Sequence, residues 1–392
     1  MRNLITVFIM FSMLLFGESF EEYKQKNQQE LGQYKKKLEE DFKNYQAIYK
    51  KELKKFKQEI YSNWGDRKTS SKSKWIEYAQ NKRVRKIVDF DKNEIVIEVI
   101  SDKNSKIVNK LLYREAIKTI ISSSKDAKEK DVLTKRVDEK FKKIAKTEFK
   151  KDKGSDRDSI LQNAIFQKPA SIGQIVKYVK KEKTKTFIKP SKIPHNKVYS
   201  IRIKLPKYFP LKKAEQLKSK VAKYSKKFKI ERALIYAIMH SESNFNPLST
   251  SHVPAYGLMQ IVPRTAGLDA YQMVYKKRRM LSASYLYNSK NNIEMGSAYL
   301  HILYYRYLKR VTNPESRMYC VIAGYNTGAG NVSRAFAGGS RKGRLKRAIK
   351  VINQMSPKQV YNTLIHKLPH DETKVYLKRV TKRVGIYRNL GI

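Results

Sequence analysis

Apolar residues recur at helical spacing through the first charged part of the chain, from Phe20 to about residue 61. Their separations of three, four and four residues repeat, which gives about 3.67 residues per turn and keeps one stripe aligned along a nearly straight helix. This period disfavours a heptad coiled coil. We therefore expect a long amphipathic helix that packs on its own chain or self-associates through residues 20–60. The stripe consists of Leu31, Tyr34, Leu38, Phe42, Tyr45, Tyr49, Leu53, Phe56 and Ile60.

The next part of the chain mixes strand and helix patterns and predicts a small α+β domain over residues 62–205. Two β-rich runs, Val84–Phe90 and Ile95–Ile100, are separated by four polar residues, which predicts a hairpin. Apolar residues at helical spacing follow in residues 107–120, and residues 199–205 alternate like another strand.

Inside this domain lies a segment, residues 122–155, that is dominated by Lys, Asp and Glu. It has few apolar residues from which to build a buried face. We therefore expect a solvated helix or a mobile insertion there.

Beyond Pro210 the apolar residues recur at helical spacing. This pattern predicts a mainly α-helical domain over residues 206–392. One helix carries four apolar residues on a single face between residues 217 and 228, and another begins near Ile230. The fold class expected for the whole chain is α+β, with the long helix first, the small α+β domain second and the helical domain last. Further helices are expected over about 292–310, 315–325, 343–355 and 371–387.

The N-terminal residues 1–19 have the pattern of an export signal. A short positive end precedes the apolar run Leu4–Phe16, which is too short to span a bilayer comfortably, and small residues at 17 and 19 precede a cleavage point before Phe20. The alternatives are an uncleaved interfacial anchor and a buried helix. No cysteine directly follows the run, so we expect export to the periplasm without a lipoprotein anchor.

The charge balance narrows the class of partner. The chain of 392 residues carries 85 Lys+Arg against 35 Asp+Glu, a net charge of +50, and part of the excess lies in 206–232 and 340–392. Nucleic acid, anionic lipid and acidic cell-wall polymer would all suit such a surface. Cys320 is the single cysteine and the six histidines show no ligand spacing, so we expect neither a metal nor a cofactor.

One carboxylate stands out as candidate chemistry. Glu242 ends an otherwise apolar helix just before Asn246-Pro247, where apolar neighbours and the negative end of the helix dipole raise the pKa of a carboxyl group. A carboxyl that stays protonated near neutral pH suits a general acid for glycosidic cleavage. A hydrolase normally has a second carboxylate, which would be Glu294 or another distant residue, or would be absent. The alternative for Glu242 is a helix-end residue in a surface ion pair.

Five blocks of sequence lie around and after Glu242, at Glu242–Pro247, Gly257–Ala266, Asn292–Leu300, Gly324–Val332 and Leu368–Leu377. Together they resemble the catalytic core of the soluble lytic transglycosylase family and follow the family's order over residues 242–377. Segments around 64–65, 88–98, 312–317 and 355–361 are also similar to a membrane-bound branch of lytic murein transglycosylases, so the resemblance covers about residues 60–390.

The resemblance implies a lysozyme-like catalytic domain that cleaves peptidoglycan without water. Glu242 would protonate the bond between N-acetylmuramic acid and N-acetylglucosamine, then act as the base while the muramic 6-hydroxyl attacks C1. The resemblance also implies a sugar-binding cleft, although Met259 and Tyr325 could instead be core residues and Asn326 a turn or cap residue. The residues that it places in this cleft are Ser251, Met259, Gln260, Tyr325, Asn326 and Tyr376.

These expectations define the partners and the competing functions. Peptidoglycan glycan strands are the expected substrate, an anionic membrane surface is a second partner, and export excludes nucleic acid. A lysozyme-type hydrolase and a non-enzymatic murein-binding scaffold are the alternative functions. The expected division is a signal peptide over 1–19, a helix over 20–61, an α+β domain over 62–205 and a catalytic domain over 206–392.

Overall fold

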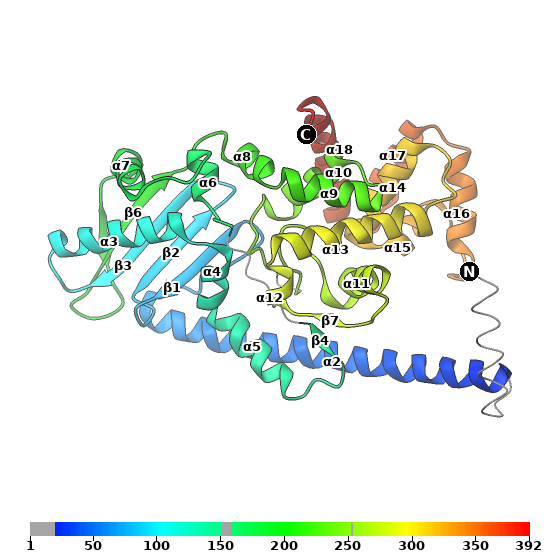
Figure 1. Ribbon diagram of the computed structural model, residues 1–392, viewed down its shortest axis with the longest axis horizontal. Coiled ribbons are helices and arrows are strands. Elements are labelled where there is room, and N and C mark those ends of the chain that lie inside the picture. The colour runs from blue at the N-terminus through cyan, green and yellow to red at the C-terminus, as the bar shows by residue number, and fades with distance from the viewer. Residues whose placement is uncertain (1–19, 151–157, 252–253) are drawn as a thin grey trace.

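The computed structural model describes residues 20–150, 158–251 and 254–392, and the predicted export signal lies outside these residues. An antiparallel sheet with its helices lies at one end of the molecule, and a helical domain lies at the other (Figure 1). The long helix α2 (Phe20–Trp64) runs along one side of both parts. The predicted α+β class is therefore confirmed.

The sheet of the first part contains the predicted hairpin. Strands β2 (Val84–Asp89) and β3 (Glu94–Ser101) pair antiparallel with Val84 opposite Val99, and β6 (Lys197–Lys204) pairs with the other edge of β3. The outer strands β1 (Lys74–Ala79) and β5 (Phe187–Pro190) complete the order β1-β2-β3-β6-β5 and were not predicted.

Helices cover one face of this sheet. Helix α3 (Ser105–Ile121), which the apolar spacing predicted, contacts β3, and α7 (Ile172–Glu182) contacts β6 (Figure 1). Every residue of β2 and all but the first of β3 are buried, because side chains on both faces of these central strands are covered. The short helix α6 (Gln162–Phe166) leads toward the helical domain.

The aromatic stripe of α2 packs against its own chain, so the first of the two alternatives for it is confirmed. Its residues Leu38, Phe42, Tyr45, Tyr49 and Ile60 are buried. The Tyr45 and Tyr256 hydroxyls share a buried hydrogen bond of 2.9 Å, which fastens the middle of α2 to the helical domain.

Of the two alternatives for residues 122–155, a solvated helix or a mobile insertion, the structure has helices, but one side of them is buried and not solvated. The segment forms α4 (Ser124–Lys130), α5 (Val132–Lys142) and the short strand β4 (Phe149–Lys150). Its few apolar residues fall on one side of α5, which packs along α2 and buries Val137 and Phe141. Composition concealed this face because charged residues fill the rest of each turn.

The helical domain begins at residue 209 and reaches almost to the C-terminus. Its helix α10 packs against α18 and α9, and α18 also packs against α14. Strand β7 of this domain pairs in parallel with β4, so the α4–α5 segment is joined to both parts of the molecule. The elements are α8 (Phe209–Gln216), α9 (Lys218–Phe228), α10 (Arg232–Ser243), the π-helical turn η1 (Pro263–Gly267), α11 (Leu268–Tyr275), β7 (Met280–Leu281), α12 (Ala283–Leu286), α13 (Ser289–Ile302), the π-helical turn η2 (Leu303–Tyr307), α14 (Pro314–Thr327), α15 (Ala329–Phe336), α16 (Arg344–Asn353), α17 (Pro357–Lys367) and α18 (Asp371–Asn389).

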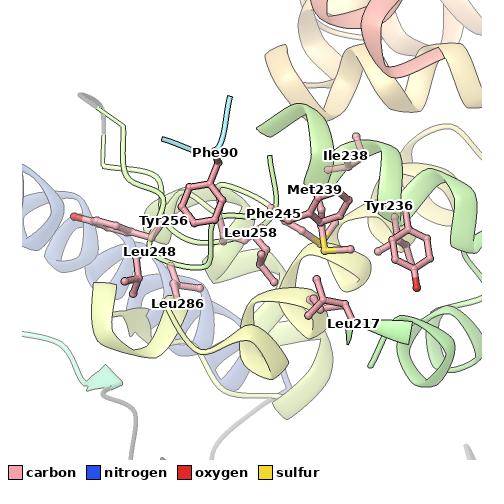
Figure 2. Packing of buried hydrophobic residues seen from close by; sticks show 14 of the residues in the cluster. Phe90, Leu217, Tyr236, Ile238, Met239, Phe245, Leu248, Tyr256, Leu258 and Leu286 are labelled. Atoms are coloured by element: carbon pink, nitrogen blue, oxygen red, sulfur yellow. The ribbon is translucent and has the colours of Figure 1, made fainter. Parts of the chain in front are cut away.

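The end of the β2–β3 hairpin inserts into the helical domain. Phe90 lies among Phe245, Leu258 and Tyr256 in the buried cluster (Figure 2). The Asn244 side-chain amide donates to the Phe90 carbonyl at 2.5 Å. Within the part of the chain that the structure describes, no helix has the length and apolar character needed to cross a membrane.

Asp41 on α2 provides a test of how firmly α2 is held. Its buried carboxylate accepts from the Lys146 and Thr147 backbone N–H groups at 2.9 Å and 2.7 Å, and from the Thr147 hydroxyl at 2.6 Å. Asp41→Ala leaves these donors without their acceptor, so we expect the free energy of unfolding to fall by about 2 kcal/mol in urea titrations.

The neighbouring Glu40 is the matched control for this prediction. Its half-exposed carboxylate pairs with the Lys146 ammonium at the surface, so Glu40→Ala should cost less than about 0.5 kcal/mol. Equal losses in the two variants would mean that α2 is not fastened through Asp41.

Candidate active site

Glu242 occupies the last turn of α10, and its side chain is only 7% exposed. The helix ends directly after it, because Asn244 and Phe245 adopt left-handed backbone conformations with φ of 50° and 61°. Such residues stop a helix and turn the chain away from its axis. The carboxyl group therefore lies where a buried helix end meets the loop that follows it.

The Tyr256–Ile261 loop is held against this helix end by hydrogen bonds. The Ser243 hydroxyl, one residue after Glu242, donates to the Leu258 carbonyl at 2.8 Å. Gly257 has a φ of 76°, and a Cβ there would lie 2.3 Å from the Leu286 carbonyl oxygen, so only glycine fits at this position.

Asn292 of α13 supports the same loop from behind and is completely buried. Its amide N–H groups donate to the Tyr256 and Leu286 carbonyls at 2.8 Å, and its carbonyl oxygen accepts from the Met259 N–H at 2.8 Å. Three backbone groups of two segments thus depend on one side chain. These three hydrogen bonds explain why an asparagine stands at the start of the Asn292–Leu300 block.

Two tyrosines from different helices lie beside Glu242. Tyr376 of α18 is nearly fully buried, and Tyr325 of α14 donates to the Met259 carbonyl at 2.8 Å. Burial raises the pKa of both phenols well above the usual value, and the negative charge of Glu242 raises each further. Both hydroxyls therefore stay protonated and can act as hydrogen-bond donors next to the carboxyl group.

The environment of Glu242 favours its neutral form. Burial raises its pKa above 4.5, and this effect exceeds the opposing influence of the Lys72 ammonium, the Tyr376 hydroxyl and the Arg379 guanidinium. The nearby carboxylate of Glu372 also raises the pKa. A carboxyl group with a raised pKa and hydrogen-bond donors nearby suits the role of a general acid.

The other residues that the sequence predicted for the cleft are Asn326, Ser251, Met259 and Gln260. Asn326 and Ser251 each accept a hydrogen bond near the site. Asn326 accepts from the Thr373 hydroxyl at 2.7 Å, which joins α14 to α18 near Tyr376. Ser251 accepts from the Ala255 N–H at 3.2 Å, in the turn that precedes the Tyr256–Ile261 loop.

Met259 and Gln260 point into the protein. Met259 is fully buried, and its sulfur would lie 2.2 Å from a Cβ at Gly296, so the glycine of α13 makes room for it. The Gln260 amide donates to the Gly257 carbonyl at 3.1 Å, and its own buried carbonyl oxygen has no hydrogen-bond partner among the described residues. Of the two polar groups of the Gln260 side chain, the NH₂ group is already bonded to Gly257. The oxygen is therefore the group that a ligand could engage.

Glu294, the alternative for a second carboxylate, is engaged elsewhere. It accepts from the Lys227 ammonium at 2.7 Å and from the Tyr275 hydroxyl at 2.8 Å. Asn292 and Gly296 of the same helix face the Gly257–Met259 loop, and Glu294 lies between them in sequence and points to another side. The carboxylate that influences Glu242 is Glu372.

Sequence reasoning did not identify the two cations that act on Glu242. Lys72 comes from the segment before β1, far away in sequence, and Arg379 lies one helical turn after Tyr376, with its guanidinium 5.8 Å from the tyrosine ring centre. Because Tyr376 was already a candidate, Arg379 one helical turn later could have been found from the sequence. Nothing in the local sequence around Lys72 indicates that it acts on the Glu242 carboxyl group.

Comparisons with known proteins match both parts of the chain to family models. A family model described as the transglycosylase SLT domain matches residues 219–347, which contain Glu242, Tyr325 and the Tyr256–Ile261 loop. A second model, described as the N-terminal domain of membrane-bound lytic murein transglycosylase C, matches residues 25–205. The helical domain is therefore of the lytic transglycosylase class, which is a class of enzymes.

Individual relatives identify the family within this class of enzymes. Membrane-bound lytic murein transglycosylase C of Pectobacterium atrosepticum is 32% identical over 342 residues, covering 85% of this chain and 88% of that protein. The protein of the same name from Serratia proteamaculans is 44% identical over 191 residues, which are 49% of this chain and about half, 52%, of that relative. The chain belongs to the membrane-bound lytic murein transglycosylase C family.

A solved structure is also similar to part of the chain. The 70 kDa soluble lytic transglycosylase of Escherichia coli is 25% identical over a match that covers 44% of this chain and 24% of that one, with a TM-score of 0.34.

The raised pKa of Glu242 predicts an effect on stability that depends on pH. Below pH 4.5 the carboxyl group is neutral in both the folded and unfolded states, and as pH rises through the higher folded pKa its ionisation increasingly disfavours the folded state. We expect Glu242→Gln to gain stability over the wild type as pH rises, by about 1.4 kcal/mol for each pH unit between the two pKa values.

Glu294→Gln is the matched control, since Glu294 is a similarly buried carboxylate on a neighbouring helix. Removing its ion pair with Lys227 should lower the free energy of unfolding at neutral pH by about 1 kcal/mol. Chemical unfolding of the wild type and both variants at several pH values measures these effects. A destabilised Glu242→Gln protein at pH 8 would contradict the assignment of a neutral carboxyl group.

Proposed function

We propose that this chain is a peptidoglycan lytic transglycosylase that breaks the bond between N-acetylmuramic acid and N-acetylglucosamine without water. The observation that carries the proposal is the buried carboxyl group of Glu242, whose pKa is raised and whose neighbours are phenols and cations. The family of the chain, whose members are named lytic murein transglycosylases, supports the same reaction.

In the proposed reaction Glu242 acts first as an acid and then as a base. Its proton passes to the glycosidic oxygen, and the bond from that oxygen to C1 of the muramic residue breaks as the N-acetylglucosamine hydroxyl leaves. The muramic 6-hydroxyl then bonds to C1 and returns its proton to the Glu242 carboxylate. The products are a 1,6-anhydromuramic end and a regenerated neutral acid, so no water is consumed.

This proposal needs no second carboxylate at the sugar ring. An inverting or retaining hydrolase uses a second carboxylate to activate water or to attack C1. Glu294 is occupied by Lys227 and Tyr275, and the Glu372 side chain is 77% exposed and lies 3.8 Å from the Lys72 ammonium. This distribution favours internal attack by the 6-hydroxyl over the alternative of a lysozyme-type hydrolase.

The remaining residues of the predicted cleft fit supporting roles in the proposal. Tyr376 would donate to a substrate oxygen or to the ionised Glu242 between the two steps, and Tyr325, whose proton goes to the Met259 carbonyl, would hold the loop beside the cleavage point. Gln260 and Asn326 would bind sugar substituents, and Ser251 would contact the strand farther from the cleavage point. Met259 would shape the cleft through its backbone, because its side chain is buried against Gly296.

The location and organisation of the enzyme are further parts of the proposal. Residues 1–19 would direct export to the periplasm, and the names of the relatives as membrane-bound proteins support association with the cell envelope. Residues 20–61, 62–205 and 206–392 would form the helix, the N-terminal domain and the catalytic domain. Self-association through residues 20–60 stays a prediction, although α2 uses much of its apolar stripe inside the chain.

Digestion of purified murein sacculi, followed by mass spectrometry of the soluble products, tests the reaction. We expect 1,6-anhydromuropeptides from the wild type and a loss of about 1000-fold or more in rate for Glu242→Gln, since the only proposed acid is removed. Reducing muropeptides would identify a hydrolase instead. Binding to sacculi with no soluble product would favour the non-enzymatic scaffold.

The surface charge of the chain predicts a second behaviour. Many Lys and Arg residues of 206–232 and 340–392 are exposed, among them residues of α9, α16 and α18. Attraction to an anionic murein or lipid surface weakens when salt screens it. We expect the rate on sacculi to fall as NaCl rises from about 0.01 M to 1 M, with the rate on short uncharged glycan fragments as the control. A flat profile on sacculi would show that the charge does not aid substrate binding.

A further inference from the structure

Strand β5 forms an outer edge of the antiparallel sheet, on the side away from the helical domain. The order β1-β2-β3-β6-β5 places β1 at the opposite edge, where the segment before β1 is bonded to residues 246–250. Four strand spacings separate the two edges, about 19 Å. Along the strands, β5 pairs with residues 197–200 of β6, away from Leu205, where the chain leaves the sheet. In Figure 1, β6 and α7 lie at the end of the molecule opposite the helical domain.

Two apolar side chains of this edge are turned to solvent. Phe187 is 64% exposed and Ile188 is 51% exposed, although both belong to a regular strand. Phe187 pairs with Ser200 and Ile188 pairs with Tyr199, so the two side chains stand on opposite faces of the sheet and flank its edge. Their apolar surface therefore projects outward from the edge and does not join the core.

Lysines surround these two residues and are almost unopposed by acids. Residues 177–197 contain eight Lys and one acidic residue, Glu182. Among the residues that the structure describes, Lys185, Lys189 and Lys197 have no carboxylate partner. The edge thus combines an apolar centre with a cationic rim. The exposed lysines include Lys177, Lys181, Lys185, Lys189 and Lys197.

Contacts with α3 hold this edge in place. The Thr186 hydroxyl donates to the Asn109 side-chain oxygen at 2.7 Å. The Lys183 ammonium lies 5.4 Å from the centre of the Tyr113 ring, which is a cation–π distance. The apolar pair is therefore presented by an ordered strand that is fastened to a helix.

The edge is protected against pairing with a further strand. Lys183 forms a bridge with Ile203, and Phe187 pairs with Ser200, so three residues of the edge oppose two of β6. This mismatch is a bulge, and Pro190 ends the strand with a residue that has no backbone N–H. Bulges, prolines and lysines are features that keep another strand from adding to an edge. A strand-forming peptide and a β5-to-β5 dimer, which would bring like charges together, are therefore disfavoured.

An anionic lipid surface suits this combination of groups. Exposed apolar side chains enter the boundary between head groups and acyl chains, while the flexible lysines reach the lipid phosphates. Each lysine near such a surface strengthens binding about fivefold. A soluble acidic polymer would pair with the lysines but would offer nothing to Phe187 and Ile188.

We propose that the β5 edge docks the protein on an anionic phospholipid bilayer, with Phe187 and Ile188 inserted at the lipid boundary and the surrounding lysines on the phosphates. Because the opposite edge of the sheet adjoins the loop that follows Glu242, the catalytic centre then lies on the side away from the bilayer. This inference extends the proposed location in the cell envelope. It does not depend on the proposed reaction, because lipid binding is measured without murein.

Vesicle binding by the full-length protein tests the cationic rim. Vesicles of phosphatidylcholine mixed with phosphatidylglycerol are compared with vesicles of phosphatidylcholine alone, and we expect the protein to prefer the anionic ones. The triple variant Lys185→Gln, Lys189→Gln, Lys197→Gln should bind the anionic vesicles about 100-fold more weakly, about fivefold for each lysine. Residues 1–19 are the same in all proteins compared, so the difference reports the sheet edge.

A second triple variant is the matched control for charge. Lys346→Gln, Lys350→Gln and Lys358→Gln remove the same charge from exposed positions of α16 and α17. We expect this variant to lose less than about fivefold in vesicle binding, because these lysines lie on the helical domain. Equal losses in the two triple variants would mean that the charge of the whole chain acts, and would overturn the docking surface.

Fluorescence quenching by lipids with brominated acyl chains locates the apolar contact. Phe187→Trp places a fluorophore at the edge, and Ile386→Trp places one at an exposed apolar position of α18 as the control. We expect the brominated vesicles to quench the fluorescence added by the first substitution and to leave that added by the second. Quenching of both or of neither would overturn the orientation.

The double variant Phe187→Gln, Ile188→Gln decides whether the apolar pair serves lipid at all. Both side chains are exposed, so the variant keeps the core intact and should bind anionic vesicles at least about tenfold more weakly. Binding equal to that of the wild type would overturn the proposal. A concentration-dependent dimer of the wild type in sedimentation, absent in the double variant, would identify a second copy as the occupant and would also overturn it.

Discussion

The burial of one carboxyl group at the end of an apolar helix is the constraint on which the rest of this site depends. Glu242 ends α10 among residues that exclude water, so its ionised form is disfavoured. A buried acid is useful only if its position is fixed and donors are present for its charged form. Ser243 fixes the helix end to the following loop, and Tyr376 supplies a donor.

The N-terminal part of the chain contributes directly to this environment. The segment that carries Lys72 is bonded to the Asn246–Thr250 stretch, and the β2–β3 hairpin places Phe90 in the cluster around Phe245 (Figure 2). Helix α2 reaches the same region from another side through Tyr45 and Tyr256. The surroundings of Glu242 therefore include segments of the N-terminal part of the chain as well as of the helical domain.

The sequence predicted those features that depend on local pattern. The hairpin, α3 and the helical character of the second half follow from the spacing of apolar residues, and the helix end at Glu242 follows from Asn246-Pro247. The packing of α5 on α2 was missed because Val137 and Phe141 are diluted by charged neighbours. Strand β1 was missed because Lys74 and Glu77 interrupt its apolar residues.

Which residues surround Glu242 depends on long-range contacts. A local sequence pattern contains no information on these contacts. The resemblance named Tyr325 and Tyr376, and both lie beside Glu242, but it did not distinguish the inward-facing Met259 from residues with an available polar group. Lys72 lies 170 positions before Glu242 and meets it only because the sheet docks on the catalytic loop. Asn292 could have been noticed as a polar residue within an apolar helix face.

The central claim is that burial raises the pKa of the Glu242 carboxyl group in the free enzyme above the usual value of a glutamate side chain. Infrared difference spectroscopy of the wild type against Glu242→Gln, titrated from pH 3 to 9, measures the protonated carboxyl band of this one residue. The account predicts that the band persists well above pH 4.5, the usual pKa of a glutamate side chain, and disappears only as the raised pKa is passed. A band that is lost at or below pH 4.5 would contradict it.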